Sequence, residues 1–271
     1  MEFAIPDELF VEANKSFRND VNLCWAAASC AALCMTGWCK PTLRVLDCEF
    51  DYVYGELAEK DVPTPYYLDS PDALLRYTAQ YIKDTGWLGY MHMMWFICGS
   101  TCGEENILKK LGGGRFYFLS AQETIKYISN ILPEDFADTF EKWGGNFETS
   151  GVNRVAGTAS FYLNATGFSP LNSSYNSLGG HEVSLWGFAT DGGKVTAVQI
   201  ADPDDEQTAR FWLDCKYDPR YHLYLATPRD DSPESWKNKK SMWLYGVTLL
   251  AGNPGFVCAK GDAREQGALD D

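Results

Sequence analysis

The pattern of hydrophobic and polar positions changes near residue 157, from helical spacing before it to strand-like segments after it. Residues 22–38 form an apolar, alanine-rich stretch that predicts a buried helix ending near Gly37. Residues 70–84 follow the start signal Asp69-Ser70-Pro71 and place their apolar side chains on one helical face. Further helices are expected over 103–111, 121–131 and 133–143.

After residue 157 the pattern favours a mostly antiparallel sheet. The expected strands are 158–164, 182–189, 195–201, 211–213, 221–226 and 242–250. Residues 166–180 are rich in Ser, Asn and Gly and predict a loop, and the polar tail 261–271 is expected to fray. Because no repeat or low-complexity linker divides the chain, we predict one α+β domain over 1–260, helical to about 150 and sheet over about 151–260.

Composition and charge limit the classes of partner. The 271 residues are 45% hydrophobic, which is enough to bury a large core. A net charge of −14 without any basic run argues against nucleic acid or an anionic membrane as partner. Gly112-Gly113-Gly114 lacks the Lys-Ser/Thr ending of a phosphate loop, so nucleotide binding is not expected.

No stretch of the sequence has the length and apolarity of a membrane span. Residues 1–6 lack the apolar region of a signal peptide. The sequence therefore fits either a cytosolic protein or a secreted one whose leader has been removed.

The nine cysteines do not decide between the cytosol and export from the cell. One reactive thiol plus eight others would permit disulfides in an exported protein. Cys98 and Cys102 flank a glycine-containing loop and are a disulfide candidate, with two separate thiols as the alternative. A zinc site is disfavoured because no Cys-x2-Cys pair occurs, and we expect neither a metal nor another cofactor. The zinc ligands would have been Cys30, Cys34, Cys39 and Cys48.

Cys24 stands where the 22–38 helix is expected to begin. A thiol at a helix N-terminus faces unpaired backbone N–H groups and the positive end of the helix dipole, which favours the nucleophilic thiolate. The alternative is an inert cysteine packed in the core.

Three histidines are available as a catalytic base. His92 lies in the aromatic and Met-rich segment 90–95 and is expected to be a hydrogen-bonded core histidine. His222 is expected inside a short strand without a distinctive partner. His181 differs because it follows two glycines and opens a strand that leads into a hairpin.

The hairpin predicts a carboxylate partner for His181. If Asp191 and Gly192 are the two loop residues, His181 pairs with Asp202 across the two strands. Such a carboxylate would orient the imidazole ring and stabilise its charged form. Together with a thiolate, this pair predicts nucleophilic catalysis, and a chance ladder pair is the alternative.

These residues resemble those of papain-like cysteine peptidases, which share the Cys24-Trp25-Ala26 run and the order Cys, His, Asp. They resemble more closely the streptococcal IgG-degrading cysteine endopeptidases of the Mac/IdeS type. The resemblance covers residues 14–30 and 179–205. It rests on Asn14-Lys15-Ser16-Phe17, Leu23-Cys24-x-Ala26-Ala27, His181-x-x-x-Leu185-Trp186-Gly187-Phe188 and Ala201-Asp202-Pro203-Asp204.

The resemblance implies a papain-like α+β fold, in which a helical lobe carries Cys24 at the N-terminus of its central helix and faces an antiparallel sheet lobe carrying His181. It implies Cys24 as the nucleophile and His181 as the general base and acid. Asp202 would orient His181, and Asp204 would be a second acidic residue supporting that strand end. Lys15 and the backbone N–H of Cys24 would stabilise the oxyanion.

By the same resemblance the substrate is a protein, with host immunoglobulin G as the first candidate, and the protein is secreted and is a monomer or weak dimer. Specificity is expected in the loops 86–118 and 164–180. Two alternatives stay open: a transglutaminase-like acyl transferase, and a non-catalytic binding module on the same scaffold.

Overall fold

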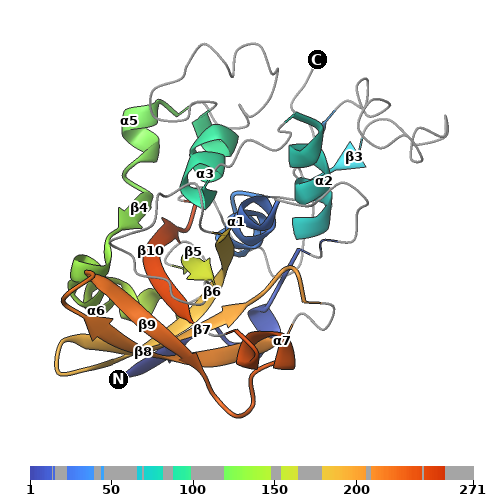
Figure 1. Ribbon diagram of the computed structural model, residues 1–271. Coiled ribbons are helices and arrows are strands. Elements are labelled where there is room, and N and C mark those ends of the chain that lie inside the picture. The colour runs from blue at the N-terminus through green and yellow to red at the C-terminus, as the bar shows by residue number, and fades with distance from the viewer. Residues whose placement is uncertain are drawn as a thin grey trace.

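The computed structural model describes residues 1–13, 15, 23–39, 44–45, 66–68, 70–81, 88–98, 119–147, 154–163, 179–205, 209–239 and 241–253. Within these ranges the protein mixes helices with an antiparallel sheet (Figure 1). The helices are η1 (Asp7–Leu9), α1 (Cys24–Met35), α2 (Pro71–Tyr81), α3 (Gly89–Cys98), α5 (Ala121–Thr124), η3 (Pro133–Asp135), α6 (Phe136–Phe147) and α7 (Glu234–Lys237). None of these described helices is long and apolar enough to cross a membrane.

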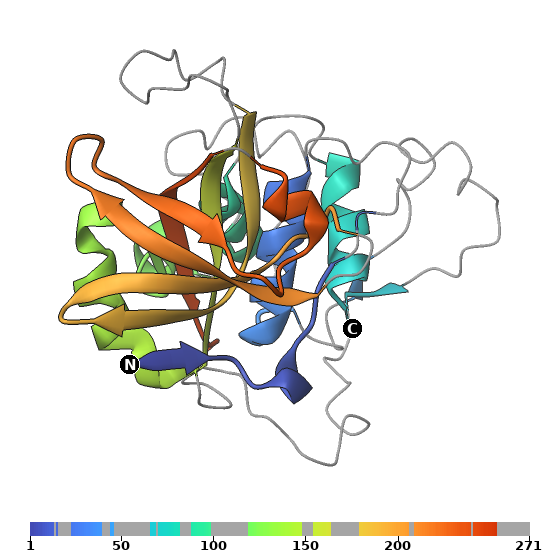
Figure 2. The ribbon, with the colours of Figure 1, turned by 60° about the horizontal axis from the view of Figure 1, so that its bottom comes forward.

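Six antiparallel strands close into a barrel, which Figure 2 shows beside the helices. They are β5 (Val155–Leu163), β6 (Gly179–Asp191), β7 (Lys194–Ala201), β8 (Arg210–Asp218), β9 (Leu223–Pro228) and β10 (Met242–Ala251). Each pairs with the next, and β10 pairs back with β5. Closure satisfies the backbone hydrogen bonds that an open sheet would leave exposed at its edges.

The two halves of the chain are interleaved. β1 (Glu2–Ala4) pairs with β6, and β4 (Ile128–Ile131) pairs with β10, although both come from the part expected to be helical. A separate pair joins β2 (Arg44–Val45) to β3 (Tyr66–Tyr67). One continuous cluster of buried side chains joins the helices to the barrel.

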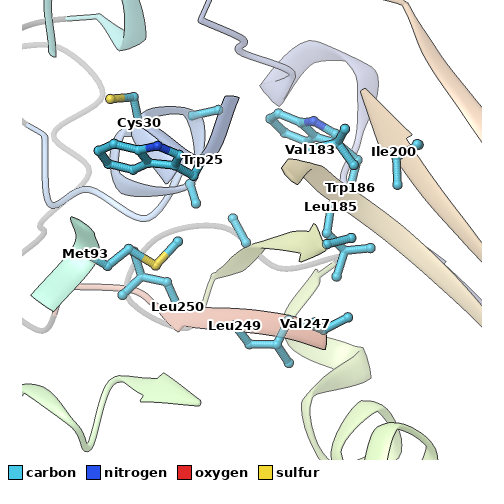
Figure 3. Packing of buried hydrophobic residues seen from close by; sticks show 14 of the residues in the cluster. Trp25, Cys30, Met93, Val183, Leu185, Trp186, Ile200, Val247, Leu249 and Leu250 are labelled. Carbon is cyan, nitrogen blue, oxygen red and sulfur yellow. The ribbon is translucent and has the colours of Figure 1, made fainter. Parts of the chain in front are cut away.

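α1 is the central helix and is surrounded by other elements. It packs against β5 and β6 of the barrel on one side and against α2 and α3 on the other (Figure 1). All its residues are buried except Cys24 and Cys34, which are half-buried. Small alanines allow this close approach on every face. Figure 3 shows Trp25 and Cys30 of α1 in the same core as Met93 of α3 and Leu185 of β6.

Glu182 holds β6 on the face opposite to His181. Because side chains alternate along a strand, Glu182 points away from its neighbour His181. The buried Glu182 carboxylate accepts hydrogen bonds from the backbone N–H of Gly89, at 2.9 and 3.0 Å, and from the Thr158 hydroxyl. Burial raises the pKa of Glu182 to about 7, although these hydrogen bonds oppose the rise. This carboxylate fastens the strand to the first residue of α3.

The structure confirms part of the helix prediction. The expected helix 22–38 is present as α1, 70–84 as α2, and 133–143 as η3 followed by α6. The helix predicted over 121–131 is wrong beyond α5, because Ile128 and Ile131 pair with β10. The segment 103–111 lies outside the described residues.

The expected loop 86–118 contains the helix α3, so that prediction is wrong over Gly89–Cys98. All six expected strands are present, but the strand expected over 211–213 is much longer than predicted, since β8 spans Arg210–Asp218. The predicted loop 166–180 is corrected at Gly179 and Gly180, which belong to β6. Residues 164–178 and the tail 261–271 lie outside the described residues.

Gly157 tests how tightly the barrel closes. A Cβ atom there would lie 2.3 Å from the backbone oxygen of Thr248 on β10. We expect Gly157→Ala to lower the free energy of unfolding by about 2 kcal/mol, because the two strands must separate to make room. Urea unfolding measures this change.

Gly246→Ala is the matched control on the facing strand, since its Cβ would meet only the Ser160 side chain at an ordinary 3.9 Å. Its stability should stay within about 0.5 kcal/mol of wild type. Equal effects of the two substitutions would contradict the close approach of β5 and β10.

Candidate active site

His181 and Asp202 meet at one end of the barrel. His181 lies near the start of β6, and Asp202 directly follows the last residue of β7. His181 Nε2 lies 2.8 Å from Asp202 Oδ1, and the two side chains are only 10% and 7% exposed. The predicted contact between these side chains is confirmed.

The strand register that led to this contact is wrong. Gly192 and Gly193 are the loop residues, both with positive φ, and Asp191 pairs with Lys194. Two register shifts follow along the hairpin, and the ladder ends where Ser184 pairs with Ala201. Asp202 therefore reaches His181 from beyond the end of the ladder and is not its cross-strand partner.

Asp202 is bound on both of its oxygens. Oδ1 also accepts a hydrogen bond from the backbone N–H of Asp204, at 3.0 Å, and Oδ2 accepts one from Trp236 Nε1, at 2.8 Å. Burial by itself raises the pKa of Asp202, but the hydrogen bond and charge of His181 outweigh burial and hold that pKa below its ordinary value. Asp202 therefore stays a carboxylate that fixes the ring.

Cys24 is the first residue of α1, and its side chain forms a hydrogen bond with His181. Because Nε2 of His181 is bound to Asp202, Nδ1 is the nitrogen that remains for the thiol. Leu23 precedes the helix and offers no side-chain cap. Cys24 is half-buried.

His181 carries its charge over most of the accessible pH range. Burial lowers the pKa of His181, but the hydrogen bonds and charges of Asp202 and Cys24 more than offset burial and raise that pKa to about 10. The imidazolium is thus held between Asp202 and Cys24. This arrangement can stabilise a thiolate and later deliver a proton.

Lys15 joins the same cluster. Its ammonium pairs with the carboxylate of Asp204, and its backbone N–H donates to the carbonyl of Pro203 at 3.4 Å. The Lys15 side chain is only 8% exposed, so it is not a solvated surface lysine. Asp204 Oδ2 also lies 4.0 Å from His181 Nδ1. All five residues singled out from the sequence therefore gather at one place.

Trp236 is a member of the site that the sequence analysis did not single out. It is fully buried on α7 and donates the indole hydrogen bond to Asp202. Its ring centroid lies 6.1 Å from that of His181. A tryptophan in a charged segment 34 residues after Asp202 gives no local signal of this role.

Glu12 is a second residue of the site that the sequence analysis did not single out. Its carboxyl group accepts hydrogen bonds from the Ser184 hydroxyl at 2.8 Å and from Trp186 Nε1 at 3.2 Å, both on β6. Burial raises the pKa of Glu12 to about 8, and the nearby charge of Asp202 adds to the rise. Glu12 therefore fastens the segment that leads to Lys15 onto the strand of His181.

The other histidines are placed differently. His92 is confirmed as a core histidine: it is buried between the hydroxyls of Ser29 and Thr78, and burial lowers its pKa to about 3. The strand prediction for His222 is wrong, because it lies in a turn with φ 54° and its Nδ1 is 3.2 Å from the Tyr217 hydroxyl.

The cysteines considered for zinc or a disulfide have other partners. The Cys30 thiol is hydrogen-bonded to Thr78, and Cys39 Sγ donates to the carbonyl of Leu68 at 2.7 Å. Cys98 Sγ donates to the carbonyl of Met94. Cys48 and Cys102 lie outside the described residues, so the Cys98–Cys102 disulfide stays a prediction.

Among the described residues, His181, Asp202 and Asp204 form the one group whose donor atoms, all within 4.8 Å of one another, could hold a metal ion. Each already has a protein partner: His181 and Asp202 bind one another, and Asp204 binds Lys15. The donor set therefore fits an ion-pair network better than a resident metal.

Asp202→Asn tests the origin of the His181 charge. Removing the carboxylate should lower the pKa of His181, since its hydrogen bond and charge, together with those of Cys24, oppose the effect of burial. NMR titration of the histidine rings measures this shift directly. Asp138→Asn, on the exposed side of α6, is the control and should leave the titration unchanged.

Glu12→Gln tests the buried carboxyl group. From about pH 5 to 8 the folded chain keeps a proton at Glu12 that the unfolded chain has released, so the stability of the wild type falls as pH rises. Glutamine stays neutral, so the variant should lose less stability over this range. Urea unfolding at pH 5, 6.5 and 8 measures the difference.

Glu141→Gln, an exposed position on α6, is the control and should follow the wild type. A Glu12→Gln variant whose stability follows the wild-type pH dependence would show that Glu12 is ionised in the folded protein.

Comparison of the chain with known protein families and with curated proteins finds no match.

Proposed function

We propose that this protein is a cysteine endopeptidase with Cys24 as its nucleophile. The observation that carries the proposal is that Cys24 and Asp202 both interact with His181, whose Nε2 lies 2.8 Å from Asp202 Oδ1. A nucleophile, a base and a group that orients the base form the arrangement typical of covalent acyl transfer. The helix N-terminus at Cys24 adds the electrostatic bias that a thiolate needs.

The reaction follows from these positions. The Cys24 thiolate attacks the carbonyl carbon of the peptide, forming a C–S bond and a tetrahedral oxyanion. As the C–N bond breaks, His181 gives its proton to the leaving amine, and an acyl-enzyme remains. His181 then takes a proton from water, the hydroxyl attacks the thioester, and the acid is released as the thiolate returns.

Two groups are assigned to the oxyanion: the backbone N–H of Cys24 and the Lys15 ammonium. An ammonium acts most strongly on charge that develops only in the tetrahedral state. Asp204 holds Lys15 by an ion pair, and Glu12 holds the preceding segment on β6. Asp204 is thus a positioning residue in this scheme, while Asp202 positions the ring of His181.

The proposed substrate is a protein outside the cell, with immunoglobulin G as the first candidate. This part rests on the resemblance of the Lys15, Cys24, His181 and Asp202 motifs to the streptococcal IgG-degrading endopeptidases. The chain's strong negative charge is compatible with a protein substrate and unfavourable for nucleic acid.

Intact-mass analysis of immunoglobulins after incubation with wild type and Cys24→Ala tests the proposal. Hinge fragments should form with wild type, and their rate should fall by more than about 10⁴-fold in the variant, because the nucleophile is gone. Rapid single alkylation of Cys24 without fragments would keep the thiol chemistry and overturn the immunoglobulin substrate. If neither alkylation of Cys24 nor fragments were observed, the binding-module alternative would remain.

Lys15→Met tests the oxyanion assignment. It should lower kcat by about 10²–10³-fold while KM changes little, since the ammonium acts on the tetrahedral state. Alkylation of Cys24 by iodoacetamide should be nearly unaffected, because that reaction forms no oxyanion. The exposed Lys126→Met is the control. Equal losses in hydrolysis and alkylation would assign Lys15 a purely structural role.

A further inference from the structure

Arg210 is a charged residue that the proposed mechanism does not use, and its side chain is only 10% exposed. It is the first residue of β8, and it pairs with Ala201, the residue that precedes Asp202. Its guanidinium contacts residues 5–13, which we call the N-terminal segment and which lead to Lys15. Figure 2 shows this part of the chain in dark blue, passing from β1 to η1 beside the barrel.

The first contact of Arg210 takes over where the pairing of β1 with β6 ends. The backbone N–H of Ile5 donates to the carbonyl of Trp186 on β6 at 2.8 Å. Pro6 has no N–H with which to continue the ladder. Nη1 of Arg210 donates to the carbonyl of Ile5. Because only 1% of Ile5 is exposed, this bond pairs a backbone oxygen that water hardly reaches.

Two further contacts of Arg210 hold the same segment. Its Cζ lies 5.2 Å from the centre of the Phe10 ring, a distance at which the ring face attracts a cation. The Phe10 ring meets that of Trp186 edge-on, with centroids 4.7 Å apart. The guanidinium also pairs with Asp7, but that side chain is 93% exposed, so water screens the pair. The Ile5 carbonyl and the Phe10 ring are therefore the contacts that carry most of the restraint.

We propose that Arg210 is a positioning residue for Lys15, acting through the N-terminal segment. The inference rests on the proposed peptidase function and on the assignment of the Lys15 ammonium to the oxyanion. Arg210 is paired with Ala201 beside Asp202, and it binds the segment that leads to Lys15. One residue thus joins the part of the chain that carries the ammonium to the strand end that carries the carboxylate.

The contacts of Lys15 itself leave a role for such a restraint. Its backbone N–H reaches the carbonyl of Pro203 at 3.4 Å, which is long for a hydrogen bond, and its ammonium pairs with Asp204, whose side chain is 45% exposed. Holding the preceding residues limits how far Lys15 can move from the thiol. Without Arg210 the ammonium should occupy the oxyanion position less often, while Cys24 and His181 stay in place on α1 and β6.

Arg210→Met tests this role, because it keeps most of the apolar stem and removes the hydrogen-bond donors. In hydrolysis of immunoglobulin G it should lower kcat by about tenfold and change KM little, since Lys15 acts on the tetrahedral state. Alkylation of Cys24 by iodoacetamide should keep its wild-type rate. Arg220→Met, in the turn after β8 with a side chain 73% exposed, changes the net charge equally and is the control.

A double-mutant cycle separates positioning of Lys15 from a general loss of structure. In the Lys15→Met background, Arg210→Met should change kcat by less than about twofold, because the group that it positions is gone. A tenfold loss in both backgrounds would overturn the inference. Slower alkylation of Cys24 in Arg210→Met would overturn it as well, because the effect would then not be confined to Lys15.

Hydrogen exchange of the full-length protein gives a readout that needs no turnover. Arg210→Met should speed exchange of the Ala13 and Lys15 amides by about tenfold and leave the amides in the middle of α1 unchanged. Wild-type exchange at Ala13 and Lys15 in this variant would overturn the Arg210 assignment and leave the peptidase proposal standing. Conversely, a wild-type protein without proteolysis or alkylation would overturn the peptidase proposal, even where exchange showed that Arg210 restrains Lys15.

Discussion

The burial of α1 on every side is the constraint on which the rest of the arrangement depends. A helix with five alanines among its twelve residues can approach the barrel closely on one side and α2 and α3 on the other. Its axis is thereby fixed relative to β5 and β6, and so is its first residue, Cys24. Because β6 carries His181, the packing that excludes water from the core also sets the thiol beside the imidazole.

The site is assembled from segments that are far apart along the chain. A single carboxylate, Asp202, accepts hydrogen bonds from His181, from the turn at Asp204 and from Trp236 on α7. These bonds tie the ends of β6 and β7 to α7, while Glu182 on the opposite face ties β6 to α3. The imidazole therefore has little freedom to turn, which is what preorganisation for proton transfer requires.

Local sequence signals were sufficient for the central helix, for the positions of the barrel strands and for Cys24, His181 and Asp202. Lys15 and Asp204 came from the family resemblance alone. The local signals predicted the contact of His181 with Asp202 but placed it in a register that the two glycines of the turn and the later shifts exclude. α3 was missed because its buried residues surround the helix, so no amphipathic period marks it. Trp236 and Glu12 form hydrogen bonds with residues remote in sequence, so no local pattern marks them. The pairing of β5 with β10 that closes the barrel is likewise not encoded by any local pattern.

The local stability of the site differs between Lys15 and the pair of Cys24 and His181. Cys24 begins a buried helix, and His181 lies on a strand that pairs with β5 at that point, so the interior amides of α1 and β6 should exchange with solvent only through large openings. Lys15 lies outside regular structure and is retained by Pro203 and Asp204. Smaller fluctuations can release it while the thiol and imidazole stay together. Hydrogen exchange would then register two opening free energies within one site, and the lower would govern how often the complete site is formed.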